Sequence, residues 1–149
     1  MALEELYQEI ILDHYRHPRN KGKIEDPDIH EHATNPLCGD EIDISAKVEN
    51  GVIKEVKFSG QGCSISQSSA SLLTEALKGK TLEEAETFIA AFREMLAGHE
   101  LPEDTGIDFG ELEALRGVTK FPARLKCATL AWNTAQEAIK AFEKTHSNH

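Results

Sequence analysis

The chain has 149 residues and a formal net charge of −10, from 26 acidic and 16 basic side chains. This length suits one domain with a sizeable core, and we expect a single domain over residues 1–149. The acidic balance argues against a nucleic-acid backbone or an anionic membrane as the main partner. No apolar run approaches the roughly 20 residues of a membrane span and no signal-peptide core opens the chain, so we expect a cytoplasmic protein.

The first predicted element is an amphipathic helix near the N-terminus. Its apolar residues recur at helical spacing from Leu3, and the pattern stops before His17-Pro18, because a residue that precedes proline disfavours the helical conformation. Residues 20–36 are polar and contain proline, so we expect a loop there with room for one short strand.

A β-hairpin is predicted next. From Glu41 onward apolar residues alternate with mostly polar ones, and the pair Asn50-Gly51 then gives a strong turn signal. In the return strand Ile53 falls on the opposite parity from its apolar neighbours, which indicates a bulge near that residue.

Capping signals predict the helices that follow the hairpin. Ser64 with Gln67 and Thr81 with Glu84 have capping-box spacing, and glycines at positions 79 and 98 mark the expected helix ends. Residues 98–122 are interrupted by Gly and Pro and are expected to form an excursion with one short helix over 111–116. A last helix precedes a frayed tail over residues 143–149.

Three widely separated cysteines in such a chain do not predict a disulfide framework. Cys38 precedes a strand, Cys63 stands at the start of one helix, and Cys127 lies near the start of another. The N–H groups and dipole at a helix start favour a thiolate. If these ends converge, the three sulfurs and the neighbouring Asp40 carboxylate form a ligand set for Zn²⁺ or for an iron–sulfur cluster. The alternative is three buried core thiols, and spacing alone leaves both interpretations open because no C-x-x-C pair is present.

A family resemblance favours the ligand interpretation. The chain resembles the U-type iron–sulfur cluster assembly proteins, which comprise NifU N-terminal domains and their IscU-like scaffold relatives, in four collinear stretches: "LDHYRHPRN" (12–20), "NPLCGDEIDI" (35–44), "VKFSGQGCSISQSSAS" (56–71) and "RLKCATLAW" (124–132). The resemblance implies an α+β fold, with a small, mainly antiparallel three-stranded sheet and about five helices packed on one side. It also implies that Cys38, Asp40, Cys63 and Cys127 share one exposed site.

Three features place the resemblance closest to the SufU branch. Lys126 stands where the scaffold branch has histidine before its third cysteine, the Leu-Pro-Pro-Val-Lys-type chaperone segment is missing from "VTKFPARLKC", and residues 98–122 resemble the insertion of that branch. The SufU branch implies a zinc centre that accepts persulfide sulfur from a cysteine desulfurase and serves downstream iron–sulfur assembly or apo-proteins.

Our hypothesis is that Cys38 is the catalytic acceptor, because its loop position gives it more freedom than the helix-start thiols. A partner side chain such as histidine would replace it on zinc, while Asp40, Cys63 and Cys127 retain the metal. The chain would then be a zinc-dependent sulfurtransferase. The alternatives are a non-enzymatic scaffold on which a [2Fe–2S] cluster is assembled and transferred, and a structural zinc module.

Two further groups of residues carry competing interpretations. Arg124 and Lys126 either offset the negative charge of the thiolates or are exposed cations at a helix start. His14 and His17 are expected to be packing or surface residues rather than metal ligands.

Overall fold

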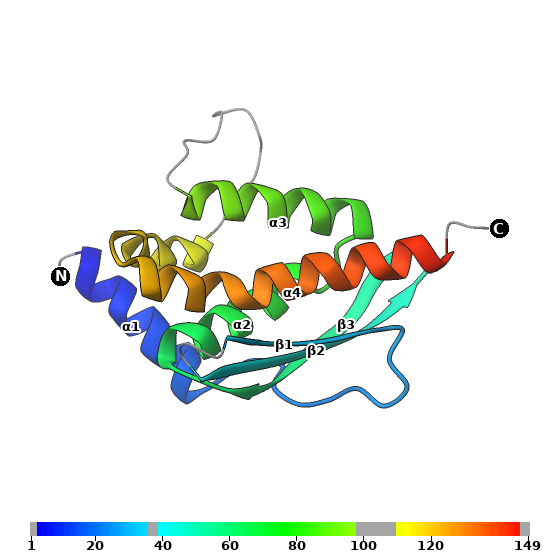
Figure 1. Ribbon diagram of the computed structural model, residues 1–149, viewed down its shortest axis with the longest axis horizontal. Coiled ribbons are helices and arrows are strands. Elements are labelled where there is room, and N and C mark those ends of the chain that lie inside the picture. The colour runs from blue at the N-terminus through cyan, green and yellow to red at the C-terminus, as the bar shows by residue number, and fades with distance from the viewer. Residues whose placement is uncertain (1–2, 36–38, 98–109, 147–149) are drawn as a thin grey trace.

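The structure is a computed structural model that describes residues 3–35, 39–97 and 110–146 (Figure 1). Over these residues it confirms the α+β prediction, with three antiparallel strands in the order β1-β2-β3 and five helices. The elements in chain order are α1 (Leu3–Arg16), β1 (Ile29–Asn35), β2 (Asp40–Glu49), β3 (Val52–Gln61), α2 (Ser64–Leu77), α3 (Leu82–Leu96), the 3-10 helix η2 (Gly110–Lys120) and α4 (Pro122–His146).

The β2–β3 hairpin forms as its sequence predicts. Asn50 and Gly51 have φ values of 54° and 76°, the positive values that a tight hairpin turn requires. The register of the pair shifts between Lys47 and Val48, so that Val48 faces Ile53. This irregularity confirms the predicted bulge near Ile53, and it brings the Ile53 side chain into the core.

One face of the sheet carries the helices. In Figure 1, α2 and α4 lie over the sheet and α3 lies beyond α4. The strand residues that point toward the helices are apolar and buried: Ile42, Ile44, Ala46, Val56 and Phe58. Trp132 of α4 is fully buried and stacks near Phe88 and Phe92 of α3, at centroid distances of 6.0 and 4.0 Å. The core therefore continues from the sheet through α4 to α3.

The other face of the sheet is crossed by the segment that joins α1 to β1. Gly22 donates its backbone N–H to the Phe58 carbonyl at 2.7 Å, along the free edge of β3. Further on, the Ile24 N–H reaches the Ser45 hydroxyl oxygen at 3.2 Å. The segment that joins α1 to β1 leaves part of this outer face uncovered. His32 of β1 is exposed there.

Helix α2 buries five hydroxyl side chains beside its apolar ones. Ser66, Ser68, Ser69, Ser71 and Thr74 are all buried. Several of these hydroxyls bond to carbonyls of their own helix, such as Ser68 to Ser64 at 2.6 Å. These side chains are small, and the hydroxyls of Ser68, Ser69, Ser71 and Thr74 have hydrogen-bond partners, so α4 and α1 can both pack closely against α2.

The structure refines several predicted element ends. It confirms α1 and the Thr81–Glu84 capping box, and it places the expected short helix of the excursion in η2. The tail was predicted to fray from residue 143, but α4 continues to His146. The expected helix end at Gly98 and most of the 98–122 insertion lie outside the described residues. Within the described chain, no helix has both the length and the hydropathy of a membrane-spanning segment.

Candidate metal centre

Asp40 is the first residue of β2 and is only 1% exposed. Its Oδ1 accepts the backbone N–H of Cys63 at 3.1 Å. Its Oδ2 is buried and has no hydrogen-bond partner among the described residues. Such an oxygen is costly to bury unless a cation or a proton reaches it. Asp40 is therefore held by one oxygen and available to a ligand through the other.

The glycine-rich approach to Cys63 is required by this carboxylate. A Cβ placed on Gly62 would lie 2.3 Å from Asp40 Oδ1, far inside van der Waals contact. Two residues before Gly62, a Cβ on Gly60 would meet the Glu41 carbonyl oxygen, and the φ of Gly60 is 130°. Gly62 thus has to lack a side chain for the Asp40 carboxylate to lie against the start of α2, and Gly60 has to lack one for β3 to approach Glu41 of β2.

Cys63 is itself the N-cap of α2, and this corrects the prediction that Ser64 and Gln67 form a capping box. Its φ and ψ of −71° and 170° lie in the extended region, and its Sγ accepts the N–H of Ser66 at 3.4 Å. Helix α2 starts at Ser64, so Cys63 takes the cap position directly before it. The Ser66 N–H at the start of α2 therefore faces the sulfur.

Cys127 lies in a different position from the one that its sequence context indicated. Helix α4 begins at Pro122, so Cys127 is in the second turn rather than at the helix start. The expected position at a helix start is consequently found for Cys63 and not for Cys127. The Cys127 side chain is 5% exposed and faces the core side of α4.

A buried serine fixes α4 relative to α2, and sequence reasoning did not single it out. The Ser69 hydroxyl donates to the Ala128 carbonyl at 2.6 Å and accepts the Trp132 Nε1–H at 3.0 Å. Ala128 follows Cys127 directly, so these two hydrogen bonds fix the position of Cys127 along the axis of α2. The serine-rich run "SISQSSAS" was the available signal, but its partners lie about 60 residues away in sequence.

The three described residues of the predicted site converge. Asp40, Cys63 and Cys127 each offer a ligand atom, and these atoms all lie within 4.8 Å of one another. Cys38, the fourth predicted ligand, lies outside the described residues. A buried carboxylate with one unpartnered oxygen, next to two thiols, is a donor set that suits Zn²⁺ or another thiophilic ion. The residues present therefore fit a metal.

Arg124 and Lys126 face different surroundings. Arg124 lines a cavity of about 650 Å³ together with Ser64 and Ile65, at the start of α2. Lys126 lines a separate cavity of about 420 Å³ between α3 and α4, beside Arg93. Of the two cations, Arg124 is the one placed beside the thiol-bearing end of α2.

The histidines of the first motif behave as predicted. His14 is 1% exposed, and its Nδ1 lies 2.8 Å from the Ser71 hydroxyl. Burial, followed by the nearby Arg19 guanidinium, holds the pKa of His14 below its ordinary value of 6.5. His17 is exposed. His14 thus joins α1 to α2 as a packing residue.

The arrangement first defines a class of protein: an α+β domain that brings a strand-start carboxylate and two helix-borne thiols together beside a three-stranded sheet. The chain belongs to the NifU-like N terminal domain family, whose model matches residues 6–127.

Similar proteins carry related names. The chain is 45% identical to the zinc-dependent sulfurtransferase SufU of Bacillus subtilis (strain 168), over 95% of this chain and 94% of that protein. It is 41% identical to the iron-sulfur cluster assembly scaffold protein IscU of Streptococcus pyogenes serotype M1, over 93% and 85%. A solved structure of a putative iron-sulfur cluster assembly scaffold protein for the SUF system from Fervidobacterium islandicum AW-1 superposes with a TM-score of 0.82 at 33% identity, covering 93% of this chain and 99% of that one.

Proposed function

We propose that this chain is a zinc-dependent sulfurtransferase of iron–sulfur cluster assembly, which accepts sulfur from a cysteine desulfurase in the cytoplasm. One observation carries the proposal. The buried Asp40 carboxylate has one oxygen with no partner among the described residues, and it offers a ligand atom within 4.8 Å of those of two thiols. The 45% identity to a protein named a zinc-dependent sulfurtransferase supports reading this arrangement as a zinc site.

Four residues would hold the zinc: Asp40, Cys63, Cys127 and, from outside the described residues, Cys38. A bound Zn²⁺ keeps its thiol ligands deprotonated at neutral pH. The chain's own contribution is to orient those ligands. The Cys63 N–H fixes the Asp40 carboxylate, and Ser69 fixes α4 beside α2.

Cys38 is the sulfur acceptor in this proposal because the other two thiols are engaged by the fold. Cys127 is 5% exposed, which leaves little room for a partner's persulfide to approach its sulfur. Cys63 Sγ already caps α2 through the Ser66 N–H. Loading either sulfur would disturb packing or a helix start, which leaves Cys38, from outside the described residues, as the proposed acceptor.

The transfer itself is a thiol exchange. The Cys38 thiolate attacks the outer, sulfane sulfur of the desulfurase cysteine persulfide. The S–S bond of that persulfide breaks, and the desulfurase cysteine leaves as a thiolate. A new S–S bond joins Cys38 to the sulfane sulfur, so sulfur is transferred without net oxidation or reduction.

The second candidate is a scaffold that carries a [2Fe–2S] cluster as cargo. Cysteine thiolates are the usual ligands of such clusters, and the relative from Streptococcus pyogenes is named a scaffold. The two candidates use the same residues and differ in what they hold. Lys126, where the scaffold branch has histidine, favours sulfur transfer.

Metal content and sulfur acceptance test the proposal. We expect freshly purified, untagged protein to contain tightly held zinc and to show no visible absorption, and we expect it to accelerate alanine release by its cognate desulfurase. The Cys38→Ala variant should fold but lose that acceleration. Unaltered acceleration by the variant would remove Cys38 from the acceptor role. A coloured protein that passes a cluster to an apo-ferredoxin without zinc would replace this proposal with the scaffold.

A further inference from the structure

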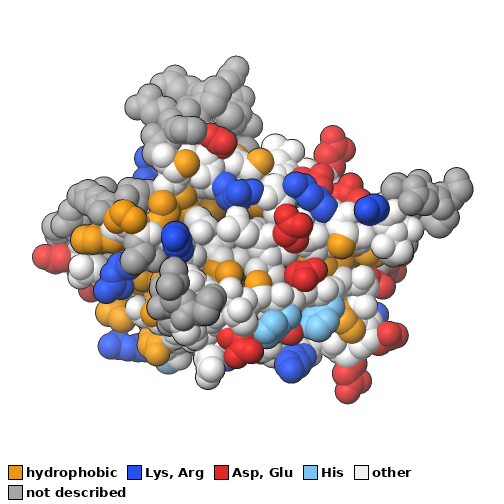
Figure 2. Space-filling view, in the orientation of Figure 1, with side chains coloured by type: hydrophobic (Ala, Val, Ile, Leu, Met, Phe, Trp, Pro, Cys, Tyr) orange, Lys and Arg blue, Asp and Glu red, His pale blue; other side chains and the backbone are white. Residues whose placement is uncertain are grey.

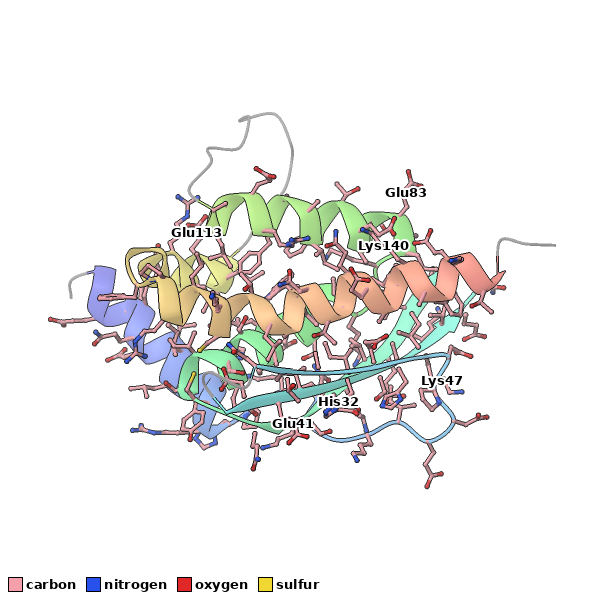
Figure 3. The ribbon with its side chains drawn as sticks, viewed as in Figure 1. His32, Glu41, Lys47, Glu83, Glu113 and Lys140 are labelled. Atoms are coloured by element: carbon pink, nitrogen blue, oxygen red, sulfur yellow. The ribbon has the colours of Figure 1, made fainter. Side chains whose placement is uncertain are left out.

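Two histidines and two carboxylates gather on the outer face of the sheet, opposite the helices. His30 and His32 lie two residues apart on β1 and therefore on the same face, while Glu41 and Asp43 do so on the neighbouring strand β2. In the β1–β2 register His32 stands directly opposite Asp43. Figure 3 shows His32 and Glu41 on the side of the sheet away from α2 and α4, and Figure 2 shows histidine beside acidic side chains on this surface.

Asp43 is the centre of this group. His30 Nε2 lies 2.9 Å from Asp43 Oδ2 and 3.0 Å from its Oδ1, and His32 Nδ1 lies 3.6 Å from Oδ2. Two ligands that share a zinc-like ion, each about 2.0–2.2 Å from it, lie about 3.0–3.5 Å apart. The three nitrogen–oxygen separations, from 2.9 to 3.6 Å, are thus close to those of ligands around one ion.

Glu41 orients the His32 ring as a metal ligand would have to be oriented. His32 Nε2 lies 3.3 Å from Glu41 Oε1, so the carboxylate can accept the ring's N–H. The other nitrogen of the same ring, Nδ1, lies 3.6 Å from Asp43 Oδ2, so the ring spans the two carboxylates and presents one nitrogen to each. A carboxylate on the far nitrogen is the usual companion of a metal-binding histidine.

We propose that His30, His32 and Asp43 form a second, surface metal site, with Glu41 as the positioning residue for His32. Its ligand is a divalent first-row transition ion of the zinc, nickel or copper kind, which imidazole and carboxylate together suit. The rings of His30 and His32 lie on either side of Asp43 and do not contact each other. Binding of the ion rotates both rings toward the Asp43 carboxylate. Their exposures of 55% and 46% allow this rotation.

The site is distinct from the thiol centre. Side chains alternate along β2, so Asp40 points toward the helices while Glu41 and Asp43 point to the outer face. The sheet itself separates the two groups of ligands. The outer site also contains no sulfur, so an oxidant that damages the thiols leaves it intact.

Titration of the zinc-loaded, untagged chain with Ni²⁺ tests the proposal, with isothermal calorimetry for affinity and equilibrium dialysis for stoichiometry. We expect one Ni²⁺ per chain beyond the resident metal. The double variant His30→Gln/His32→Gln should lower that affinity by at least about 100-fold, and Glu41→Gln by about 10-fold, since loss of a ligand-orienting partner costs about 10–100-fold. The matched control, His17→Gln/His146→Gln/His149→Gln, removes histidines outside the group and should bind Ni²⁺ as the wild type does.

Absence of Ni²⁺ uptake by the wild type, or uptake by the double variant with wild-type affinity, would overturn the proposal. Loss of uptake in the triple control instead would assign the Ni²⁺ to those other histidines and would equally overturn it. The double variant should keep its resident zinc and its stimulation of alanine release. The result on the outer face is therefore separate from that on the sulfurtransferase.

Discussion

The two faces of β2 hold carboxylates under opposite conditions. Asp40 lies on the helix face with Ile42 and Ile44, almost wholly buried, and its position is set by a backbone N–H and a bare glycine. Asp43 lies on the outer face, 17% exposed, between two histidine rings that are half in solvent. A single strand thus places one carboxylate inside the protein and another on its surface.

The difference shows how burial decides what a polar side chain needs. The buried carboxylate depends on groups from β3 and α2, because no solvent is present to replace a missing partner. The surface carboxylate depends only on its neighbours across the β1–β2 ladder, and water substitutes for any of them. Changes on the two faces should therefore differ in size, and the following predictions are ordered from the largest effect to the smallest.

Truncating a buried side chain should separate the faces most clearly. We expect Ile44→Ala, on the helix face, to lower the free energy of unfolding by about 2–5 kcal/mol, because it leaves a cavity under α2 and α4. The adjacent change Asp43→Ala, on the outer face, should cost less than about 1 kcal/mol. Urea denaturation of both variants measures the difference, and equal losses would mean that the outer face carries more of the stability than its exposure indicates.

Adding one methyl group beside the buried carboxylate should weaken the metal centre. In Gly62→Ala the new Cβ would lie 2.3 Å from Asp40 Oδ1, so the carboxylate has to move. We expect zinc affinity, measured by competition with a chelator, to fall by about 10–100-fold, the usual effect of disturbing groups that orient a ligand. Gly117→Ala is the control, since its Cβ would meet no atom within 4 Å. Unchanged affinity in Gly62→Ala would show that Asp40 is not a ligand.

The comparison extends to the histidines, of which His14 is buried and His17 is exposed. Because burial lowers the pKa of His14 below 6.5, the unfolded chain binds a proton more readily than the folded one as the pH falls through 6.5. Folding stability should therefore be full above that pH and decline below it, by less than about 1.4 kcal/mol per pH unit. Urea denaturation at pH 7.5 and 5.5 measures the decline. His14→Gln should flatten it, whereas His17→Gln should keep the wild-type slope, and equal slopes in all three proteins would contradict the assignment.

A carboxylate pair between α3 and α4 should give the smallest effect and the opposite sign. A hydrogen bond with Glu143 raises the pKa of Glu86, followed by partial burial. The folded state then holds that proton more tightly than the unfolded chain, so this contribution is present at low pH and is lost as the pH rises through the raised pKa. We expect Glu86→Gln to raise the thermal midpoint slightly at pH 7 and to leave it unchanged at pH 4. A lower midpoint at pH 7 would show that the pair is not repulsive.

Much of the fold could be predicted because its signals are local. The end of α1 before His17-Pro18, the Asn50-Gly51 turn and the Thr81 cap each depend on residues a few positions apart. Strand β1 was predicted only as a possible short strand, because Glu31 occupies an inward position near the sheet edge and weakens the alternation. Where a cap was misassigned, at Ser64, a thiol performed the role that serine usually has.

The candidate site was predicted through resemblance, and its supports were not predicted. Spacing alone left the three cysteines open to a core interpretation, since they are far apart in sequence. The dependence of Asp40 on Gly62, and of α4 on Ser69, arises only when β3, α2 and α4 are placed side by side. No local pattern contains those contacts, so they require coordinates.

The sulfur cap of α2 has a practical consequence for mutagenesis. Serine is among the most favourable residues at a helix N-cap, so the routine thiol-removing exchange at position 63 replaces the cap with a better one. Compared as metal-free proteins, Cys63→Ser should therefore melt no earlier than the parent even though its chemistry is gone. Screens of metal-free variants by expression or thermal shift would pass such a protein as healthy.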